Sequence, residues 1–158
     1  MLPLLYRRAR NAAFPAAENR LSPVPRIMLG ATGLVAVTLL VTAALLRPDN
    51  RGFGTHQQLG LPACTFVEIF GIRCPSCGMT TSWSNLLHGR PVAALKANVG
   101  GALLATIALV LGPWALGSAV FGGWLFLRGD EMVLIVLAVG VTAVTLLDWS
   151  ARIWLGME

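Results

Sequence analysis

The feature that most constrains this chain is a set of three long runs without a charged residue. Residues 27–46 form an uncharged run of 20, which as a helix rising about 1.5 Å per residue spans ~30 Å, the thickness of the hydrocarbon core of a bilayer. Residues 97–127 form a second run of 31, and residues 132–147 form a third of 16. A chain segment exposed to lipid can satisfy its own backbone hydrogen bonds as a helix. The pattern therefore predicts three transmembrane helices, at about 27–46, 98–127 and 132–149.

The composition excludes the alternatives to a membrane protein. Charged residues make up 12% of the 158, about half of the ~25% that is usual in soluble domains. A disordered chain needs low hydrophobicity, whereas 56% of these residues are hydrophobic. The formal net charge of +5 does not indicate nucleic acid, because five of the twelve basic residues precede the first apolar run. Basic residues at that place orient a membrane protein.

These observations divide the chain into two parts. Residues 1–26 are basic and interrupted by proline, and we expect an irregular cytoplasmic arm. Residues 27–158 form the membrane domain; its first run exceeds the ~7–15 apolar residues of a signal peptide, so we expect it to be retained. With the N-terminus inside, the segment 47–96 lies outside the cytoplasm. The predicted location is the cell (inner) membrane, as a multi-pass protein.

The segment 61–96 contains all three cysteines of the chain, within fourteen residues of one another: Cys64, Cys74 and Cys77. Cys64 to Phe70 form a short apolar stretch that Gly71 ends, which predicts a short helix followed by a bend. The bend should return the chain toward Cys64. We therefore expect the sulfur of Cys64 to approach those of the other two cysteines.

Helix signals follow the second cysteine. Pro75 suits the first turn of a helix, which we expect to run to His88 and to end with Gly89 at positive φ. Pro91 begins a further helix, which we expect to continue into the second span. The cysteines would then lie at a helix N-terminus, in a short helical hairpin that lies in the membrane interface or re-enters the membrane. One face of the helix that ends at His88 is polar and should face water or the protein interior: Cys77, Thr81, Ser84 or Asn85, and His88.

Three hypotheses account for the cysteines. Cys74 and Cys77 form a C-x-x-C pair, and a helix N-terminus would favour their thiolates for redox chemistry, although no thioredoxin-like βαβ pattern surrounds them. Alternatively, Cys64, Cys74 and Cys77 together supply three thiolate ligands to one Zn²⁺. The third hypothesis is structural: a disulfide or packed thiols fix the bend. The structural hypothesis is the leading one at this stage.

A fourth zinc ligand is not obvious in the sequence. In a continuous helix His88 lies ~16 Å along the axis from Cys77, whereas ligand atoms on one metal lie within ~4 Å of one another. We therefore interpret His88 as a partner of the helix C-terminus. His56, in a polar loop, is expected to be solvated, and Asn98 is expected to form a hydrogen bond between helices.

The pattern around the cysteines resembles that of a known family. The residues that carry the resemblance are Cys64, then Cys74-Pro75-Ser76-Cys77-Gly78-Met79-Thr80, then Leu86-Leu87-His88-Gly89, Ala93-Ala94 and Asn98. They resemble a family of small uncharacterised bacterial membrane proteins, a domain of unknown function with a C-P-x-C-G-x-T core, over roughly residues 60–147. The motif residues besides the cysteines are Pro75, Gly78, Thr80, His88, Gly89 and Asn98. Many members have arginine after the core threonine, where this chain has Thr81.

The sequence therefore predicts an all-α integral membrane protein of unassigned biochemical role. We expect its Cys-rich extracytoplasmic hairpin to be a structural or interaction element rather than an enzyme active site. The alternative is a thiol-redox or zinc-binding site at the membrane surface, with zinc as the one cofactor that the pattern suggests. The expected partners are the lipid bilayer and either another membrane protein or further copies of this chain, not nucleic acid.

Overall fold

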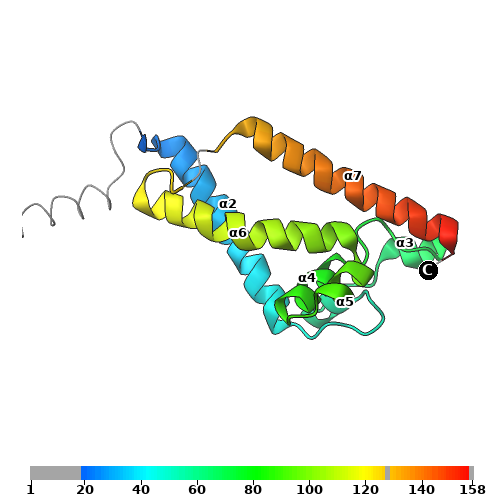
Figure 1. Ribbon diagram of the computed structural model, residues 1–158. Coiled ribbons are helices and arrows are strands. Elements are labelled where there is room, and N and C mark those ends of the chain that lie inside the picture. The colour runs from blue at the N-terminus through cyan, green and yellow to red at the C-terminus, as the bar shows by residue number, and fades with distance from the viewer. Residues whose placement is uncertain (1–18, 127–128, 157–158) are drawn as a thin grey trace, which may run out of the picture.

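The computed structural model describes residues 19–126 and 129–156 (Figure 1). The described part is helical, which confirms the predicted all-α class. Its elements in order are α2 (Pro23–Leu45), the 3-10 helix η2 (Thr55–Leu59), α3 (Thr65–Phe70), α4 (Met79–Leu87), α5 (Pro91–Ala97), α6 (Val99–Phe121) and α7 (Glu131–Leu155). The predicted cytoplasmic arm lies outside the described residues as far as residue 18.

Three of these helices are long and apolar enough to span a membrane, as predicted. The most apolar windows of α2, α6 and α7 have mean hydropathies of 2.1, 1.9 and 2.2. α6 continues through Pro113 and ends at Phe121, where Gly122 adopts a φ of 71°. The chain then folds back, and the amide of Leu21 donates a hydrogen bond of 3.1 Å to the carbonyl oxygen of Gly122. The end of the second apolar run therefore turns back rather than lengthening the helix.

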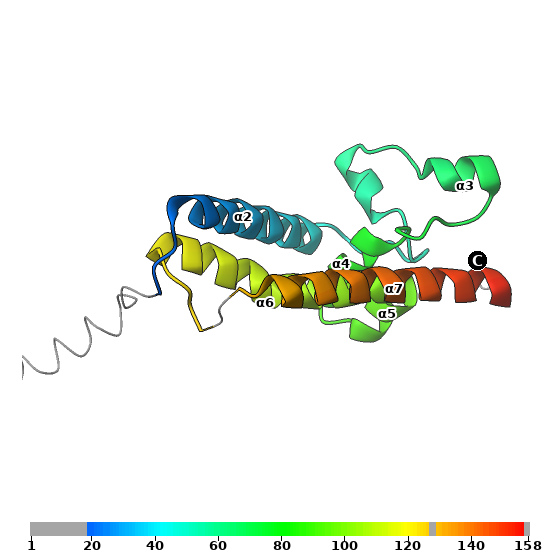
Figure 2. The same ribbon diagram turned by 90° about the horizontal axis from the view of Figure 1, so that it is seen from above.

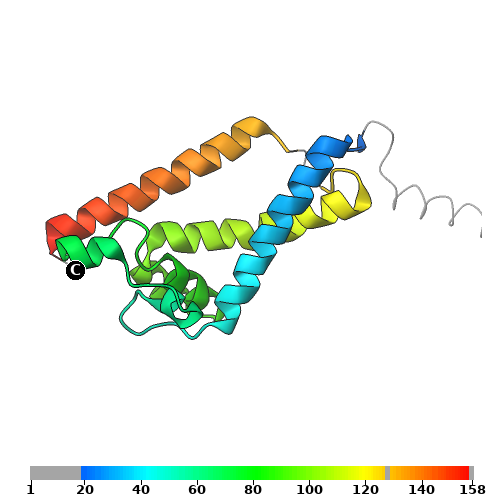
Figure 3. The same ribbon diagram turned by 180° about the vertical axis from the view of Figure 1, so that it is seen from behind.

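The crossing of α2 and α6 forms the centre of the bundle (Figures 1 and 3). A Cβ atom on Gly33 of α2 would lie 2.6 Å from the backbone nitrogen of Leu116 and 3.0 Å from the carbonyl oxygen of Gly112, both in α6. Glycine at this position lets the two backbones touch. Small residues at such crossings promote helix association in lipid, where the hydrophobic effect does not favour it.

α7 joins the bundle through its C-terminal half. Thr145 is its buried residue and packs against Gly100 at the start of α6. Trp149 Nε1 donates a hydrogen bond of 2.6 Å to the carbonyl oxygen of Arg73, and Arg152 donates one of 2.9 Å to that of Lys96. Figure 1 shows the N-terminal half of α7 apart from α6. The helix is therefore attached at the end of the bundle where the cysteine segment lies.

The short elements η2, α3, α4 and α5 gather at the end of the bundle where α2 ends and α6 begins, and Figure 2 shows α3 extending away from it. Their interior is polar: Thr55, Thr81, Ser82 and Ser84 are fully buried. Ser84 Oγ donates a hydrogen bond of 2.7 Å to the carbonyl oxygen of Leu46 at the end of α2. The polar face of α4 therefore faces the protein interior, where hydrogen bonds offset its desolvation.

Two predicted helix boundaries are wrong, for tertiary reasons. α4 begins at Met79 rather than near Pro75, because Gly78 at a φ of 83° separates it from the preceding turn. α5 ends at Ala97 instead of continuing into the span, because Asn98 is extended at a φ of −166°. Two other predictions are confirmed: α3 ends at Gly71 with a φ of 68°, and Gly89 has a φ of 71° after α4.

Candidate metal centre

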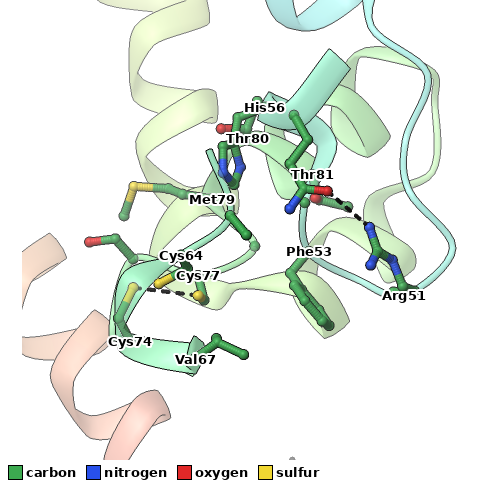
Figure 4. A pocket seen from close by; sticks show the side chains of 15 residues that line it. Arg51, Phe53, His56, Cys64, Val67, Cys74, Cys77, Met79, Thr80 and Thr81 are labelled. Carbon is green, nitrogen blue, oxygen red and sulfur yellow. Dashed lines mark hydrogen bonds between the residues drawn. The ribbon is translucent and has the colours of Figure 1, made fainter. Parts of the chain in front are cut away.

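The sulfur atoms of Cys64, Cys74 and Cys77 all lie within 4.8 Å of one another (Figure 4). Cys64 is the N-cap residue of α3, whereas the other two lie in the turn that precedes α4. All three are free thiols, and the Sγ atoms of Cys74 and Cys77 are 3.4 Å apart. The convergence expected from the bend at Gly71 is therefore present, although the C-x-x-C pair precedes the helix rather than beginning it.

The turn from Cys74 to Cys77 is held by its own backbone and by α7. The amide of Cys77 donates a hydrogen bond of 2.9 Å to the carbonyl oxygen of Cys74, which brings the two side chains to the same side. One residue earlier, the carbonyl oxygen of Arg73 accepts the hydrogen bond from Trp149. The C-terminal half of α7 thus fixes the entry to the turn.

Asn98 fixes the exit of the turn and the start of α6 together. Its Nδ2 donates hydrogen bonds of 3.0 Å to the carbonyl oxygen of Pro75 and 3.1 Å to that of Cys77. Its Oδ1 accepts a bond of 2.7 Å from the amide of Gly101, which caps α6. The expected contact between helices is in fact a contact between a helix and the cysteine turn. Asn98 therefore positions two of the three sulfurs.

Gly78 is required by both backbone conformation and space. It adopts a φ of 83°, and a Cβ atom there would lie 2.5 Å from the carbonyl oxygen of Ala97 and 2.7 Å from that of Gly52. These oxygens belong to the end of α5 and to the loop after α2. The cysteine turn is thus packed between two distant segments of backbone, which leaves no room for a side chain.

The three thiols do not ionise alike. Burial acts to raise the pKa of Cys64, but hydrogen bonds from the Val67 amide, the Cys77 and Cys74 thiols and the Phe66 amide outweigh it and lower that pKa to about 7. Burial, together with the neighbouring sulfurs of Cys74 and Cys64, raises the pKa of Cys77 to about 12. The cluster therefore favours ionisation of Cys64 over ionisation of Cys77.

The sulfurs form part of the wall of a cavity of about 470 Å³. The opposite wall includes His56, Gln57 and Arg51 from the loop and 3-10 helix after α2, and Thr80 also lines it (Figure 4). The His56 ring is half-buried, and its Nε2 lies 3.2 Å from the carbonyl oxygen of Pro62. A residue that the sequence suggests is merely solvated therefore faces the same cavity as the cysteines.

The placement of His56 has no signature in the local sequence. The hydroxyl groups of Thr55 and Thr81 form a buried hydrogen bond of 2.8 Å, which attaches η2 to α4. Thr81 occupies the position where the family resemblance expects arginine.

His88 lies at the other end of α4. Its Nδ1 lies 2.8 Å from the carbonyl oxygen of Ser84, which agrees with a role at the helix terminus.

Comparison with known proteins gives a match of part of the chain to one family model, and no function. Residues 64–112 match the sequence model of a family described as Protein of unknown function (DUF2752). This match begins at Cys64, includes the other two cysteines and Asn98, and ends within α6. Neither the curated proteins nor the solved structures contain a match to this chain.

Proposed function

We propose that Cys64, Cys74 and Cys77 bind one thiophilic metal ion, with Zn²⁺ as the first candidate, at the end of the membrane bundle. The observation that carries this proposal is the approach of all three sulfurs to within 4.8 Å of one another. With Zn–S bonds of about 2.3 Å, sulfurs on a tetrahedral ion lie about 3.8 Å apart. Small side-chain rotations would therefore suffice to place all three on a single ion.

The third cysteine distinguishes a metal site from a dithiol. A redox pair needs Cys74 and Cys77, whose sulfurs are 3.4 Å apart, but gives no reason for Cys64 to converge on them. Cys64 arrives from a different segment through the bend after α3. A metal ion bound by all three would join that segment to the turn before α4, and so would also serve the structural role that the sequence suggests.

The fourth coordination position faces the cavity of about 470 Å³. The His56 imidazole lines the same cavity but does not lie within 4.8 Å of all three sulfurs, so it would have to leave the Pro62 carbonyl and move toward them to complete a Cys₃His set. If water occupies the position instead, the metal keeps an open site of the kind that catalytic zinc uses. Replacing His56 distinguishes these two forms.

Metal analysis of the purified full chain in detergent tests the proposal. We expect about one equivalent of zinc per chain, and loss of binding in each of C64S, C74S and C77S. Ser76→Ala is the matched control, because Ser76 lines the same cavity in the same turn without offering a sulfur. H56A weakens binding if the imidazole is a ligand and leaves it unchanged if water is.

Two results would overturn the metal proposal. One is the absence of metal together with a Cys74–Cys77 disulfide in the freshly isolated protein, detected by mass spectrometry after thiol alkylation. The other is full metal retention in C64S. The first result would make the site a dithiol, and the second would remove Cys64 from the ligand set.

For orientation, we propose that the N-terminus is cytoplasmic and that the cysteine segment lies outside the cytoplasm, at the inner membrane of the cell. The support is the concentration of five arginines in residues 1–26. Three membrane spans then place the two chain termini on opposite sides. Accessibility of the three cysteines in intact cells to a thiol reagent that does not cross membranes tests this orientation: labelling supports it, and labelling after lysis alone contradicts it.

A further inference from the structure

A second cavity, of about 350 Å³, lies beside the cysteine turn and is lined by basic side chains from four places in the chain: Arg51, Arg73, Arg90 and Lys96. Arg51 belongs to the loop after α2, and Arg73 immediately precedes Cys74. Arg90 joins α4 to α5, and Lys96 lies in the last turn of α5. The tertiary fold, rather than a basic run in the sequence, therefore brings these four cations to one cavity.

The cavity carries an excess of positive charge. Among the described residues that line it, the acidic one is Asp49, whereas Arg90 and Lys96 add two positive charges beyond the pair of Asp49 with Arg51. That carboxylate is already engaged, because Asp49 Oδ2 lies 2.7 Å from a guanidinium nitrogen of Arg51. Arg73 keeps its guanidinium 4.4 Å from the ring centre of Phe53, which orients it at this wall.

Helix electrostatics account for two of the four cations and leave Arg51 and Arg73 to be explained. A cation in the last turn of a helix interacts favourably with the helix dipole, which explains Lys96. Arg90 is the N-cap residue of α5, and its amide also donates to the carbonyl oxygen of Asn85, so it lies at the C-terminal end of α4 as well, where a cation is favourable. Arg90 and Lys96 line the same cavity, and an anion there would offset their mutual repulsion.

We infer that this cavity binds a phosphate group. Arginine presents a planar fork of donors that matches the oxygens of phosphate, and lysine adds a mobile point charge. The site lies where the candidate span α2 ends and the candidate span α6 begins, and the ends of helices that cross a bilayer come near the lipid headgroups. On α5, Val92 and Leu95 are 65% and 47% exposed, as expected of a helix that rests on the membrane interface. The phosphate thus comes from an anionic phospholipid headgroup or from solution.

The experiment compares two sources of phosphate with the full chain. In one arm, the protein is reconstituted in nanodiscs of phosphatidylcholine with and without phosphatidylglycerol, and lipids retained after detergent extraction are identified by native mass spectrometry. In the other arm, inorganic phosphate is titrated into the detergent-solubilised protein while its thermal unfolding is followed. Ligand binding to the folded state raises the unfolding temperature.

The variants are R90Q, K96Q and the double variant, with R47Q as the matched control. Arg47 is exposed in the same loop region after α2 but does not line the cavity, so R47Q removes the same charge elsewhere. The backbone bonds of both target residues survive: the Arg90 amide bonds to Asn85, and the Lys96 carbonyl accepts from Arg152. Loss of one charge-assisted contact should weaken binding about tenfold or more in each single variant.

Selective retention of phosphatidylglycerol by the wild type and R47Q, but not by the double variant, supports a lipid headgroup. A shift with inorganic phosphate alone, lost in the same variants, supports a site for phosphate from solution. If neither source binds, or if R47Q weakens binding as much as R90Q and K96Q do, the inference is wrong. Metal content is measured on the same samples, and the phosphate site stands or fails independently of it.

Discussion

Replacing Asn98 by alanine should unfold the cysteine turn and uncap α6 in one step. The side chain is 4% exposed and makes three hydrogen bonds of 2.7–3.1 Å, one to α6 and two to the turn. Losing an N-cap costs about 1 kcal/mol, and leaving a buried carbonyl without its donor costs about 1–3 kcal/mol. Because water can reach part of the turn through the cavity, we expect a loss of about 2–4 kcal/mol in the free energy of unfolding.

The same substitution should weaken metal binding. Asn98 is hydrogen-bonded to the backbone of Pro75 and Cys77, so it orients one proposed ligand directly and a second through the short turn. Supporting contacts of this kind are typically worth 10- to 100-fold in metal affinity. The measurements are competition with a chromophoric zinc chelator and denaturant unfolding followed by circular dichroism, both in detergent.

Two further variants separate the cap from the turn. N98D keeps an oxygen that can accept from the amide of Gly101 but removes both donors to the turn, so it should retain the cap and still lose metal affinity. N85A is the matched control: Asn85 is 6% exposed, and its Nδ2 donates a bond of 3.0 Å within α4, to the carbonyl of Thr81. It should lose about 1 kcal/mol of stability and keep its metal affinity. Wild-type metal affinity in both Asn98 variants would refute the reasoning.

Three more predictions concern Gly78, the metal site and the membrane orientation. Gly78→Ala should destabilise the protein by at least about 2–3 kcal/mol, because the new Cβ atom combines a positive φ with close contact against two carbonyl oxygens. The control is Gly60→Ala, at a φ of 77° with open space around it, which should cost about 1 kcal/mol. Equal losses of stability in thermal unfolding would contradict this prediction. Zinc affinity should rise with pH between 6 and 8.5, by about tenfold per pH unit for each proton released, because the pKa of Cys77 near 12 keeps that thiol protonated until the metal displaces its proton. Calorimetry in buffers of different ionisation enthalpy measures the number of protons released. An affinity that does not change with pH would contradict this prediction. A reporter fused after Glu158 should be active outside the cytoplasm, and activity confined to the cytoplasm would contradict the proposed orientation.

The local sequence was enough to predict several parts of the cysteine segment. Gly71 and Gly89 end short helices, and Gly89 does so at positive φ, as predicted, because a glycine that follows the last helical residue stops a helix without help from distant contacts. Pro91 begins α5 for a similarly local reason: an amide hydrogen in the first turn has no partner within the helix, so proline loses no hydrogen bond there. From these breaks alone, the approach of Cys64 to the other cysteines could be anticipated.

Other parts of the site depend on residues far apart in the chain. The start of α4 at Met79 follows from the packing of Gly78 against the backbone of Gly52 and Ala97. The break between α5 and α6 lies at Asn98, whose side-chain amide donates a hydrogen bond to the carbonyl oxygen of Pro75 in the cysteine turn. Local helix signals predicted the wrong boundary in both places, because they do not reflect contacts between distant residues.

The sequence by itself determined that three helices are long and apolar enough to span a membrane. The comparison is between the length of an apolar run and the thickness of a bilayer, and it does not depend on any tertiary contact. The tertiary structure alone decided that His56 shares a cavity with the three sulfurs and that Arg51, Arg73, Arg90 and Lys96 share another. These groups come from loops and short helices whose paths are fixed by buried polar contacts, such as that between Thr55 and Thr81. Such contacts join residues at separations that no helical period encodes, so the sites exist only once the chain has folded.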